Sequence, residues 1–412
     1  MSNGRGGKSV AVLGGGLSGC CTALVLAQRG ARVTLFDRAD RLFARTSLHN
    51  EGKIHFGYVY AGDSSLATAR LLVRGALCFA PFLKHYLDLA SENIELSSSH
   101  AYLVHNRSQR SLDHISRYFG AVHGLIQEAA SGAKDRYFGL DLGQPPRRWS
   151  TAELEGAFNS EKTIAAFGTQ ELAIDPYALA PIFRDRISAT STIDVRLQHS
   201  VRAVSKAGDR LHVVTEGPDG QESTDYDHVV NALWDGRLAI DATLGHRPKR
   251  PWLYRFRYGL RFEARDILKV PLSLTVVHGQ FGGVVCYANG AMYLEWYPAC
   301  MVGLSNALEP PDRPTQASEP LRSRIMRDTI GALGEIIPAI CTLSQDARAG
   351  AAVIGGNIFA WGATDTDDLA SDLHQRYDIG VMSSGNYHSV DPGKFSMAPY
   401  FAEICADRIL PS

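Results

Sequence analysis

The sequence predicts an α/β protein in which a Rossmann-like domain is interleaved with an α+β domain built on an antiparallel sheet. Three observations predict this fold. Residues 8–36 contain a valine-rich strand, a glycine-rich turn, a helix and a second strand in immediate succession. Residues 253–304 instead contain short runs rich in valine, leucine and aromatic residues, which are typical of strands. Glycine is also over-represented, with 39 among 412 residues, whereas roughly 7% is usual in proteins.

The N-terminal segment predicts a complete βαβ unit. Residues 8–13 (KSVAVL) form a short apolar run, as expected for a buried parallel strand. A glycine-rich turn follows at 14–19, and residues 20–29 are predicted to form a helix with Gly30 at its C-cap. A second strand is expected at 31–36 (ARVTLF). The glycine-rich turn therefore joins a strand to the start of a helix.

The spacing in this turn predicts a dinucleotide site. Glycines in the pattern G-x-G-x-x-G permit a tight turn and a close approach of the backbone to a pyrophosphate, which the helix N-terminus attracts. Asp37 lies 23 residues after the first of these glycines, where a carboxylate accepts from an adenosine ribose hydroxyl. An acid at this position argues against a 2′-phosphate and hence against NADP. The predicted contacts in the turn are Gly14, Gly16, Leu17, Ser18 and Gly19.

The order of the later segments favours FAD over NAD. A plain NAD dehydrogenase should continue at once with further strand–helix units, but the next predicted elements are helices at 64–90 and 112–130. Capped helices are predicted at Ser150 and Asp175, short strands over 193–230, and a helix from about Ser396 to the end. FAD is longer than the Rossmann crevice, so distant segments must hold its ring end.

Composition excludes several other classes of protein. Lys and Arg number 42 against 43 Asp and Glu, so the basic excess of a nucleic-acid binder is missing. The seven cysteines form no C-x-x-C pair and no zinc-spaced cluster, which predicts a reducing, cytoplasmic setting and no metal site. The sequence contains no uninterrupted run of 18 apolar residues, so no membrane-spanning helix is expected.

Five stretches of the chain resemble the D-amino acid oxidase superfamily, which includes glycine oxidase, sarcosine oxidase and L-2-hydroxyglutarate dehydrogenase. They are the segment from Gly14 to Asp37, the loop TSLHNEGKIHFG at 46–57, Ile174-Asp175-Pro176, the strand VVNA at 229–232 followed by Trp234, and Ser384-Gly385-Asn386 with Gly393 before a terminal helix. The fourth stretch lacks a glycine of the family pattern. Val59 also stands where the hydroxyglutarate branch usually has a second tyrosine.

The resemblance implies an FAD cofactor and a set of residues that contact it. The loop at 46–53 would wrap the pyrophosphate and ribityl chain. Lys394, before the last helix, would stabilise the negative charge of reduced flavin together with the helix N-terminus. Besides the turn and Asp37, the implied contacts are Arg38, Thr46, Ser47, Asn50, Gly52, Lys53, Val201, Ala232, Trp234, Gly385, Asn386, Gly393 and Lys394.

Four residues are predicted on the substrate side. His55 is the best candidate for a base, and Tyr58 could line the pocket, as could Tyr60. His388 is a second histidine candidate. Arg257 alternates on one strand with Arg255 and Arg261, so these arginines either face solvent or provide a carboxylate anchor. Arg376 is a further candidate for that anchor.

The predicted function is an FAD-dependent oxidoreductase, an oxidase or dehydrogenase of a biosynthetic or catabolic pathway. Hydride would pass to flavin from a small amine, amino acid, hydroxy acid or sugar derivative, and then to oxygen or another acceptor. The alternatives are a non-redox flavin-dependent isomerase or mutase acting on a sugar nucleotide, and a non-catalytic flavin-binding protein. A homo-oligomer is left open.

The same pattern predicts a discontinuous domain organisation. The FAD-binding domain would comprise residues 1–63, 150–245 and 350–412. The substrate domain would comprise residues 64–149 and 246–349.

Overall fold

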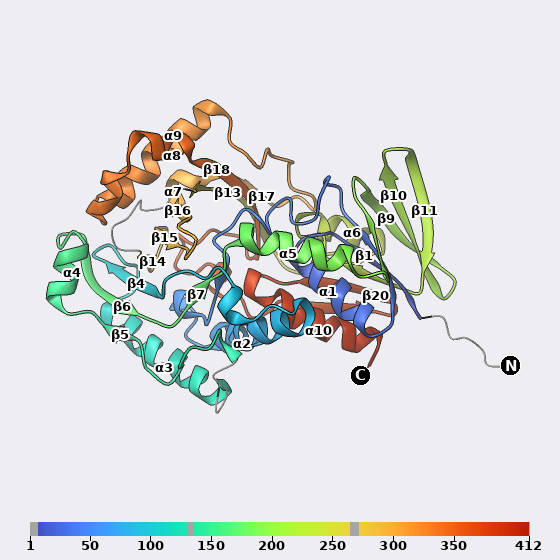
Figure 1. Cartoon of the computed structure of the whole chain (residues 1–412), viewed down its shortest axis with the longest axis horizontal. Helices are drawn as coiled ribbons and strands as arrows, with labels where there is room; N and C mark the ends of the chain where they lie inside the picture. Colours follow the sequence, from blue (N-terminus) through green and yellow to red (C-terminus); the bar gives the residue numbers. More distant parts are fainter. Residues whose placement is uncertain (1–6, 131–135, 264–271, 412) are drawn as a thin grey trace.

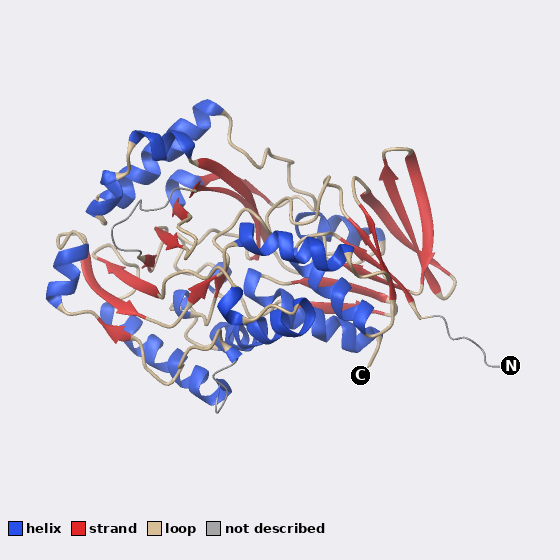
Figure 2. Ribbon diagram, in the orientation of Figure 1, coloured by secondary structure: helices blue, strands red, loops and turns tan. Residues whose placement is uncertain are grey.

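The computed structural model describes residues 7–130, 136–263 and 272–411. Two large sheets occupy the two ends of the molecule, with the long helices between and around them (Figure 1). Figure 2 shows the helices of the left-hand part on its outer surface, so the strands of that part face inward. The architecture is the predicted combination of a Rossmann-like sheet with a second, mainly antiparallel sheet.

The first sheet has six strands in the order β19-β20-β12-β1-β2-β8. All neighbours are parallel except β19 and β20, which form a hairpin. The strands are β1 (Ser9–Leu13), β2 (Arg32–Phe36), β8 (Ile193–Arg196), β12 (His228–Asn231), β19 (Gly380–Ser384) and β20 (Tyr387–Asp391). The strands of the predicted βαβ unit therefore lie at the centre of the sheet, where both faces are buried.

Helices cover this sheet and share its core. The helices α1 (Leu17–Gln28) and α10 (Ala398–Ile409) pack on each other, and α2 (Ala67–Leu87) and α5 (Pro176–Ser188) lie beside them (Figure 1). α1 is apolar almost all round, as expected of a helix buried between a sheet and another helix. The short α6 (Arg237–Thr243) follows β12. One apolar cluster includes residues of α1, α2, α5 and α10.

A three-stranded antiparallel sheet projects from the Rossmann-like part, at the right of Figure 1. It comprises β9 (Ser200–Ala207), β10 (Arg210–Gly217) and β11 (Gly220–Tyr226). The turn at 217–220 joins β10 to β11, with Gly220 at φ +110°. Strand β9 begins beside the end of β2, which brings Val201 to the dinucleotide cavity described below.

The second large sheet has nine strands and carries the other domain's core. Its order is β17-β13-β16-β15-β14-β4-β6-β5, with β18 also paired to β13. The strands are β4 (His100–His105), β5 (Arg147–Arg148), β6 (Thr163–Gly168), β13 (Trp252–Phe262), β14 (Ser273–Val277), β15 (Gly282–Cys286), β16 (Met292–Trp296), β17 (Met301–Ser305) and β18 (Ala352–Trp361). Only β4 and β14 are parallel neighbours.

The remaining elements border this sheet. They are α3 (Leu112–Ala130), α4 (Thr151–Ala157), α7 (Tyr297–Cys300), α8 (Glu319–Gly334) and α9 (Gln345–Gly350), with a two-stranded ribbon of β3 (Lys53–Ile54) and β7 (Leu172–Ala173). The predicted capping box at Ser150 is present, because its Oγ accepts from the Glu153 N–H and the Glu153 carboxylate accepts from the Ser150 N–H. Asp175 likewise caps α5 through the Tyr177 N–H.

The sheets correct the predicted domain boundaries at three places. Strand β18 pairs along its length with β13, so residues 352–361 belong to the second sheet rather than to the Rossmann-like part. Strand β6 pairs with β4 of that same sheet. Helix α2 packs on α10, on the Rossmann-like side. These long-range pairings depend on partners far away in sequence, which local pattern does not specify.

Candidate active site

Two connected cavities lie between the sheets. The larger, of about 390 Å³, follows the carboxyl edge of the six-stranded sheet. The smaller, of about 190 Å³, lies against the nine-stranded sheet. Their shared wall is formed by Glu51, Lys53, His55, Arg257, Ile358 and Lys394. A ligand that fills the larger cavity would therefore present one end to the smaller one.

The carboxyl ends of the parallel strands bring several of the predicted cofactor contacts together. Gly14 follows β1, Asp37 follows β2, Ala232 follows β12, and Gly393 follows β20. These ends meet at one edge of a parallel sheet, where doubly wound proteins bind dinucleotides. All four residues line the larger cavity.

The glycine-rich turn fits a pyrophosphate. Gly14 has φ +103°, and a Cβ there would lie 2.7 Å from the Ala232 carbonyl oxygen. A Cβ on Gly19 would lie 1.7 Å from the Gly14 carbonyl oxygen. Gly19 thus allows α1 to start against the turn, so the free N–H groups of the helix N-terminus point at the cavity. Gly19 itself packs behind the turn, outside the residues that line the cavity.

Asp37 and the loop at 46–53 are held in place by backbone hydrogen bonds. Asp37 Oδ2 accepts from Gly15 N at 2.6 Å, and its Oδ1 accepts from Ala39 N at 2.8 Å. Burial raises the pKa of Asp37, and these two hydrogen bonds oppose that rise. Ser47 Oγ accepts from Leu17 N at 2.9 Å, which ties the loop to the start of α1.

Most of the predicted cofactor contacts line the larger cavity. They are Gly14, Gly16, Leu17, Ser18, Asp37, Arg38, Thr46, Ser47, Asn50, Lys53, Val201, Ala232, Trp234, Gly393 and Lys394. Asn50 acts within the loop as well, because its amide donates to the Thr46 and Ser47 carbonyls.

Besides Gly19, three predicted contacts lie elsewhere. Gly385 and Asn386 form the turn that precedes β20, and Asn386 Nδ2 donates to the Asp209 carbonyl. They therefore lie at the amino edge of the sheet, opposite the cavity. Gly52 has φ +61°, and a Cβ there would lie 1.9 Å from the Ile174 carbonyl oxygen. Its close contact is with the chain near β7 and not with the cavity.

Lys53 is buried at the junction of the cavities. Its Nζ donates to the Tyr102 hydroxyl at 2.8 Å and lies 3.3 Å from Glu171 Oε2. The Lys53 side chain is 3% exposed, and that of Glu171 is fully buried. Burial lowers the pKa of Lys53, while the Glu171 carboxylate acts in the opposite direction. The charge of Lys53 therefore already has a partner inside the protein.

Arg257 is also neutralised, by two carboxylates. Its Nη1 donates to Glu295 Oε1 at 3.0 Å, and its Nη2 lies 2.8 Å from Glu295 Oε2 and 3.7 Å from Glu51 Oε2. The neighbouring Arg255 donates to Asp365 Oδ1 at 2.9 Å. Arg261 lies outside the cavities in a bidentate pair with Asp175. Each of these three arginines therefore has a carboxylate partner.

Two other cations have no carboxylate partner within the part of the chain that the structure describes. Within the described residues, neither Lys394 nor Arg376 forms an ion pair, whereas Lys53, Arg255 and Arg257 all do. Arg376 is 6% exposed, and its only hydrogen-bonded side-chain atom among those residues is Nη1, which donates to the Phe359 carbonyl. Both side chains line the smaller cavity.

Tyr60 lies beside these two cations. Lys394 Nζ lies 5.5 Å from the centre of the Tyr60 ring. Burial raises the pKa of the Tyr60 hydroxyl, but the charges of Lys394 and Arg376 act against burial and leave that pKa below its usual value.

His55 lines both cavities and is 5% exposed. Burial lowers the pKa of His55 well below its usual value, and the charges of Lys394 and Lys53 lower it further. The imidazole is therefore neutral at neutral pH. It can form hydrogen bonds to a ligand, but it is a poor acceptor of a proton.

The positions expected for Tyr58 and His388 are corrected by the structure. Tyr58 is 1% exposed and packs edge-on against Phe119 with ring centres 5.2 Å apart, so it points into the core, and Tyr60 lines the cavity instead. His388 Nε2 lies 3.3 Å from His228 Nδ1, and its Nδ1 lies 2.8 Å from Ser383 Oγ. That site is near the amino edge of the sheet, away from both cavities.

Comparison with known proteins agrees with the geometry of the larger cavity. The model of the FAD dependent oxidoreductase family, DAO, matches residues 9–350. The chain belongs to this family. FAD is therefore its cofactor, and the cavity, the glycine turn at Gly14 and the carboxylate of Asp37 that lines the cavity fit that dinucleotide. The family is one of oxidoreductases, so the chain is an enzyme of that class.

Similar solved structures extend over nearly the whole chain. Glycine oxidase of Geobacillus kaustophilus has a TM-score of 0.67 at 14% identity, covering 97% of this chain and 94% of its own. L-proline dehydrogenase of P. horikoshii has a TM-score of 0.65 at 15% identity, covering 98% and 93%. Reduced L-α-glycerophosphate oxidase of Mycoplasma pneumoniae, with FAD bound, has a TM-score of 0.65 at 17% identity, covering 98% and 95%. At these identities the likeness concerns the fold.

A curated sequence relative is similar over a short stretch. It is the FAD-dependent monooxygenase FPY4 of Fusarium mangiferae, 37% identical over 82 residues. The match covers 20% of this chain and 21% of the relative. It supports a flavoenzyme without indicating the reaction.

Sequence reasoning missed several polar residues of the oxidoreductase's cavities. Glu51 stands inside the quoted loop, directly before Gly52, and could have been selected for its position in that motif. Glu295 lies on β16 and belongs to no motif. Glu171 is not among the residues that line the cavities, but it pairs with Lys53, and it too belongs to no motif. Within the described ranges, no helix is long and apolar enough to cross a membrane. The same residues contain no group of three or more His, Cys, Asp or Glu that could hold a metal.

Proposed function

We propose that this enzyme oxidises a small amine that also carries an anionic group, such as an amino acid. The observation that carries the proposal is the presence of two cations without ion-pair partners among the described residues, Lys394 and Arg376, in the cavity next to the flavin cradle. A buried guanidinium without a counter-ion is costly, so a site that holds one is suited to an anionic ligand. Several solved structures of similar fold are named for enzymes acting on amino acids, which agrees with this substrate class.

Within this proposal each part of the cavity has a role. Bound FAD supplies the acceptor for a hydride from the substrate carbon. Lys394 and Arg376 bind and orient the anionic group, so that the reacting carbon is held next to the shared wall of the cavities. His55, neutral and at that wall, offers a hydrogen bond to the substrate. Apolar side chains such as Val276, Phe281 and Leu373 exclude water from the remainder.

The size of the smaller cavity argues against a sugar nucleotide as substrate. Such a substrate has a nucleotide part of its own, and the cavity beyond the flavin cradle is about 190 Å³, half the volume of the dinucleotide cavity at about 390 Å³. A small hydroxy acid would fit the same cations as an amino acid, and the experiment below distinguishes the two.

An anaerobic bleaching screen tests the proposal. The purified yellow enzyme would be mixed without oxygen with amino acids, N-methyl amino acids, hydroxy acids and neutral amines, and flavin absorbance would be followed. We expect bleaching by compounds that combine an amine with a carboxylate. Admission of air, or addition of an artificial electron acceptor, then identifies the oxidant. Equal bleaching by a neutral amine and its carboxylated analogue would refute the role of the two cations.

Variants sharpen this test. Lys394→Met and Arg376→Met should each raise the concentration needed for half-maximal bleaching by about 10- to 150-fold, because each removes a charge-assisted bond of about 1.5–3 kcal/mol. Arg250→Met is the matched control, because Arg250 pairs with Asp378 on the surface and lines neither cavity. The control should change that concentration by less than about twofold.

A further inference from the structure

A group of two carboxylates and one guanidinium lies where the flavin and substrate cavities meet. Glu51 comes from the loop before β3, Arg257 from β13 and Glu295 from β16. Arg257 Nη2 lies 2.8 Å from Glu295 Oε2 and 3.7 Å from Glu51 Oε2. All three line the smaller cavity. Their side chains are 15–21% exposed, so they reach its surface without being open to bulk solvent.

The charges of this group do not balance. One guanidinium faces two carboxylates, which leaves one negative charge over. Lys53 is next in line, but Glu171 already neutralises it at 3.3 Å. Lys394 acts on both glutamates from the loop after β20, yet it forms no ion pair with either among the described residues. Two like charges on one partner favour the binding of a proton by one of them.

We propose that Glu295, coupled to Glu51 through Arg257, is the resident base that removes the ammonium proton of the substrate. This inference rests on the proposed function and adds a catalytic residue to it. In the step, an N–H bond of the substrate ammonium breaks, its electron pair stays on nitrogen, and the proton passes to a Glu295 oxygen. The free amine can then release hydride, with its electron pair, from the adjacent carbon to the bound flavin, as a C=N bond forms. One proton and one hydride leave the substrate, which is oxidised by two electrons.

Glu295 suits this role better than the other groups of the cavity. Burial raises the pKa of Glu295 to about 7, with the Arg257 charge opposing and the Glu51 charge adding to the rise. A base is most effective when its pKa lies near the working pH. Burial also acts to raise the pKa of Glu51, but the charges of Arg257 and Lys394 outweigh it and leave that pKa low. His55 lies too close to Lys394 and Lys53 to accept a proton readily.

Charged and titratable groups face Glu295 from every side that packs on it. They are Arg257 on β13, Glu51 before β3, Lys53 on β3, Lys394 after β20, Tyr293 on β16 itself and Cys300 on α7. The pKa values of the Tyr293 and Cys300 side chains are raised by burial, so neither ionises near pH 7. Glu295 is therefore the carboxylate of this group whose protonation changes near pH 7, because the pKa of Glu51 stays low.

The first measurement needs no substrate. Infrared difference spectra of the FAD-loaded enzyme between pH 9 and pH 5 should contain the carbonyl band of a protonated carboxyl group that appears with a midpoint near 7. The band should be absent from Glu295→Gln. It should persist in Asp365→Asn, the matched control, which removes the carboxylate of the neighbouring Arg255 pair. A band of equal size in Glu295→Gln would overturn the proposal.

The second measurement uses the amino acid that bleaches the flavin best. The limiting rate of anaerobic bleaching should fall below about pH 7 in the wild type and in Asp365→Asn. Glu295→Gln should bleach at least about 100-fold more slowly, without that acidic limb, because general bases contribute about 10²–10⁴-fold. Glu295→Asp keeps a carboxylate and should keep the limb at an intermediate rate. The visible spectrum of bound flavin shows whether each variant still holds its cofactor.

The outcomes separate this inference from the proposed function. If no amine bleaches the flavin, both fail. If amino acids bleach it but Glu295→Gln keeps the rate within threefold of wild type, or keeps the acidic limb, the inference alone fails.

Discussion

The pair of Asp175 and Arg261 joins the start of α5 to β13 of the nine-stranded sheet, and replacing Asp175 by Asn should be strongly destabilising. Asp175 caps α5 and accepts two bonds from Arg261 of β13, at 2.8 and 2.9 Å. It also accepts from Asn289 Nδ2 at 2.8 Å and from Tyr177 N at 3.0 Å. The two charged side chains are 1% and 4% exposed.

The magnitude follows from the loss of charge at an unchanged size. Asn keeps an oxygen for Tyr177 N–H, so the cap survives, but Arg261 loses its buried counter-ion; its other partner, Glu263, is 64% exposed. Breaking a buried pair from one side costs about 3–5 kcal/mol. With a urea slope of about 3 kcal/mol/M, the midpoint of unfolding should fall by about 1–2 M.

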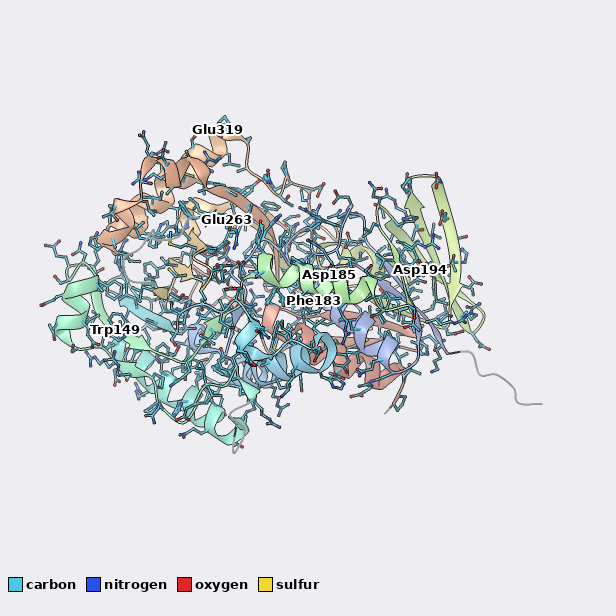
Figure 3. The ribbon with its side chains drawn as sticks, viewed as in Figure 1. Trp149, Phe183, Asp185, Asp194, Glu263 and Glu319 are labelled. Atoms are coloured by element: carbon cyan, nitrogen blue, oxygen red, sulfur yellow. The ribbon has the colours of Figure 1, made fainter. Side chains whose placement is uncertain are left out.

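Urea titrations followed by tryptophan fluorescence and by release of flavin would measure this change. Asp194→Asn is the matched control, because Asp194 pairs with Arg196 at 2.8 Å with side chains 57% and 50% exposed. Asp194 lies far from Glu263 in Figure 3. Exposed pairs contribute about 0–1 kcal/mol. The reasoning is refuted if Asp175→Asn lowers the midpoint no more than the control, or if Asp175→Asn/Arg261→Met costs the full sum of its single variants, since coupled sites should not be additive.

Two further predictions concern the cofactor cradle and the effect of acid. Gly19→Ala should abolish flavin retention, because the new Cβ would lie 1.7 Å from the Gly14 carbonyl oxygen. Retention is measured as the ratio of flavin absorbance to protein absorbance in the purified protein. Gly124→Ala on α3, where nothing lies within 4 Å of the new Cβ, should retain flavin fully, and loss of flavin from this control would contradict the steric explanation. Acid should destabilise the protein below about pH 6.5, because burial holds the pKa of His388 at about 4 against 6.5 unfolded, so the unfolded chain binds the extra proton. Between pH 7 and pH 5, His388→Asn should lose about 2 kcal/mol less free energy of unfolding than wild type, and equal losses would contradict this assignment.

The elements with strong local patterns were predictable. The βαβ unit at 8–36 depends on an apolar strand, a glycine-rich turn and a helix that are adjacent in sequence, and all three form as expected. Helix α3 spans the predicted residues 112–130. The cap at Ser150 depends on a partner three residues away. In each case the hydrogen-bonding partners lie within a few residues, so the local sequence specifies them.

The part of the candidate site that follows strand ends was predictable on physical grounds. Gly14, Asp37, Ala232 and Gly393 all follow central parallel strands, so the topology brings them to one edge. Gly385 and Asn386 come from the same motif as Gly393, but one strand earlier, and the length of β20 separates them from the cavity. A motif gives the order of its residues, whereas the strand between them decides on which edge each one lies.

The charges of the smaller cavity were decided by the tertiary structure alone. Arg257 and Arg376 both lie near strands. The residues next to them in sequence do not show which of the two has a carboxylate partner in the folded protein. Arg257 meets Glu51 from more than 200 residues earlier and Glu295 from another strand, while Arg376 meets no carboxylate among the described residues. By itself the sequence determined the cofactor fold, through short-range geometry. Which cation stays free for a ligand depends on long-range pairing, because electrostatic partners are set by distance in space and not by distance along the chain.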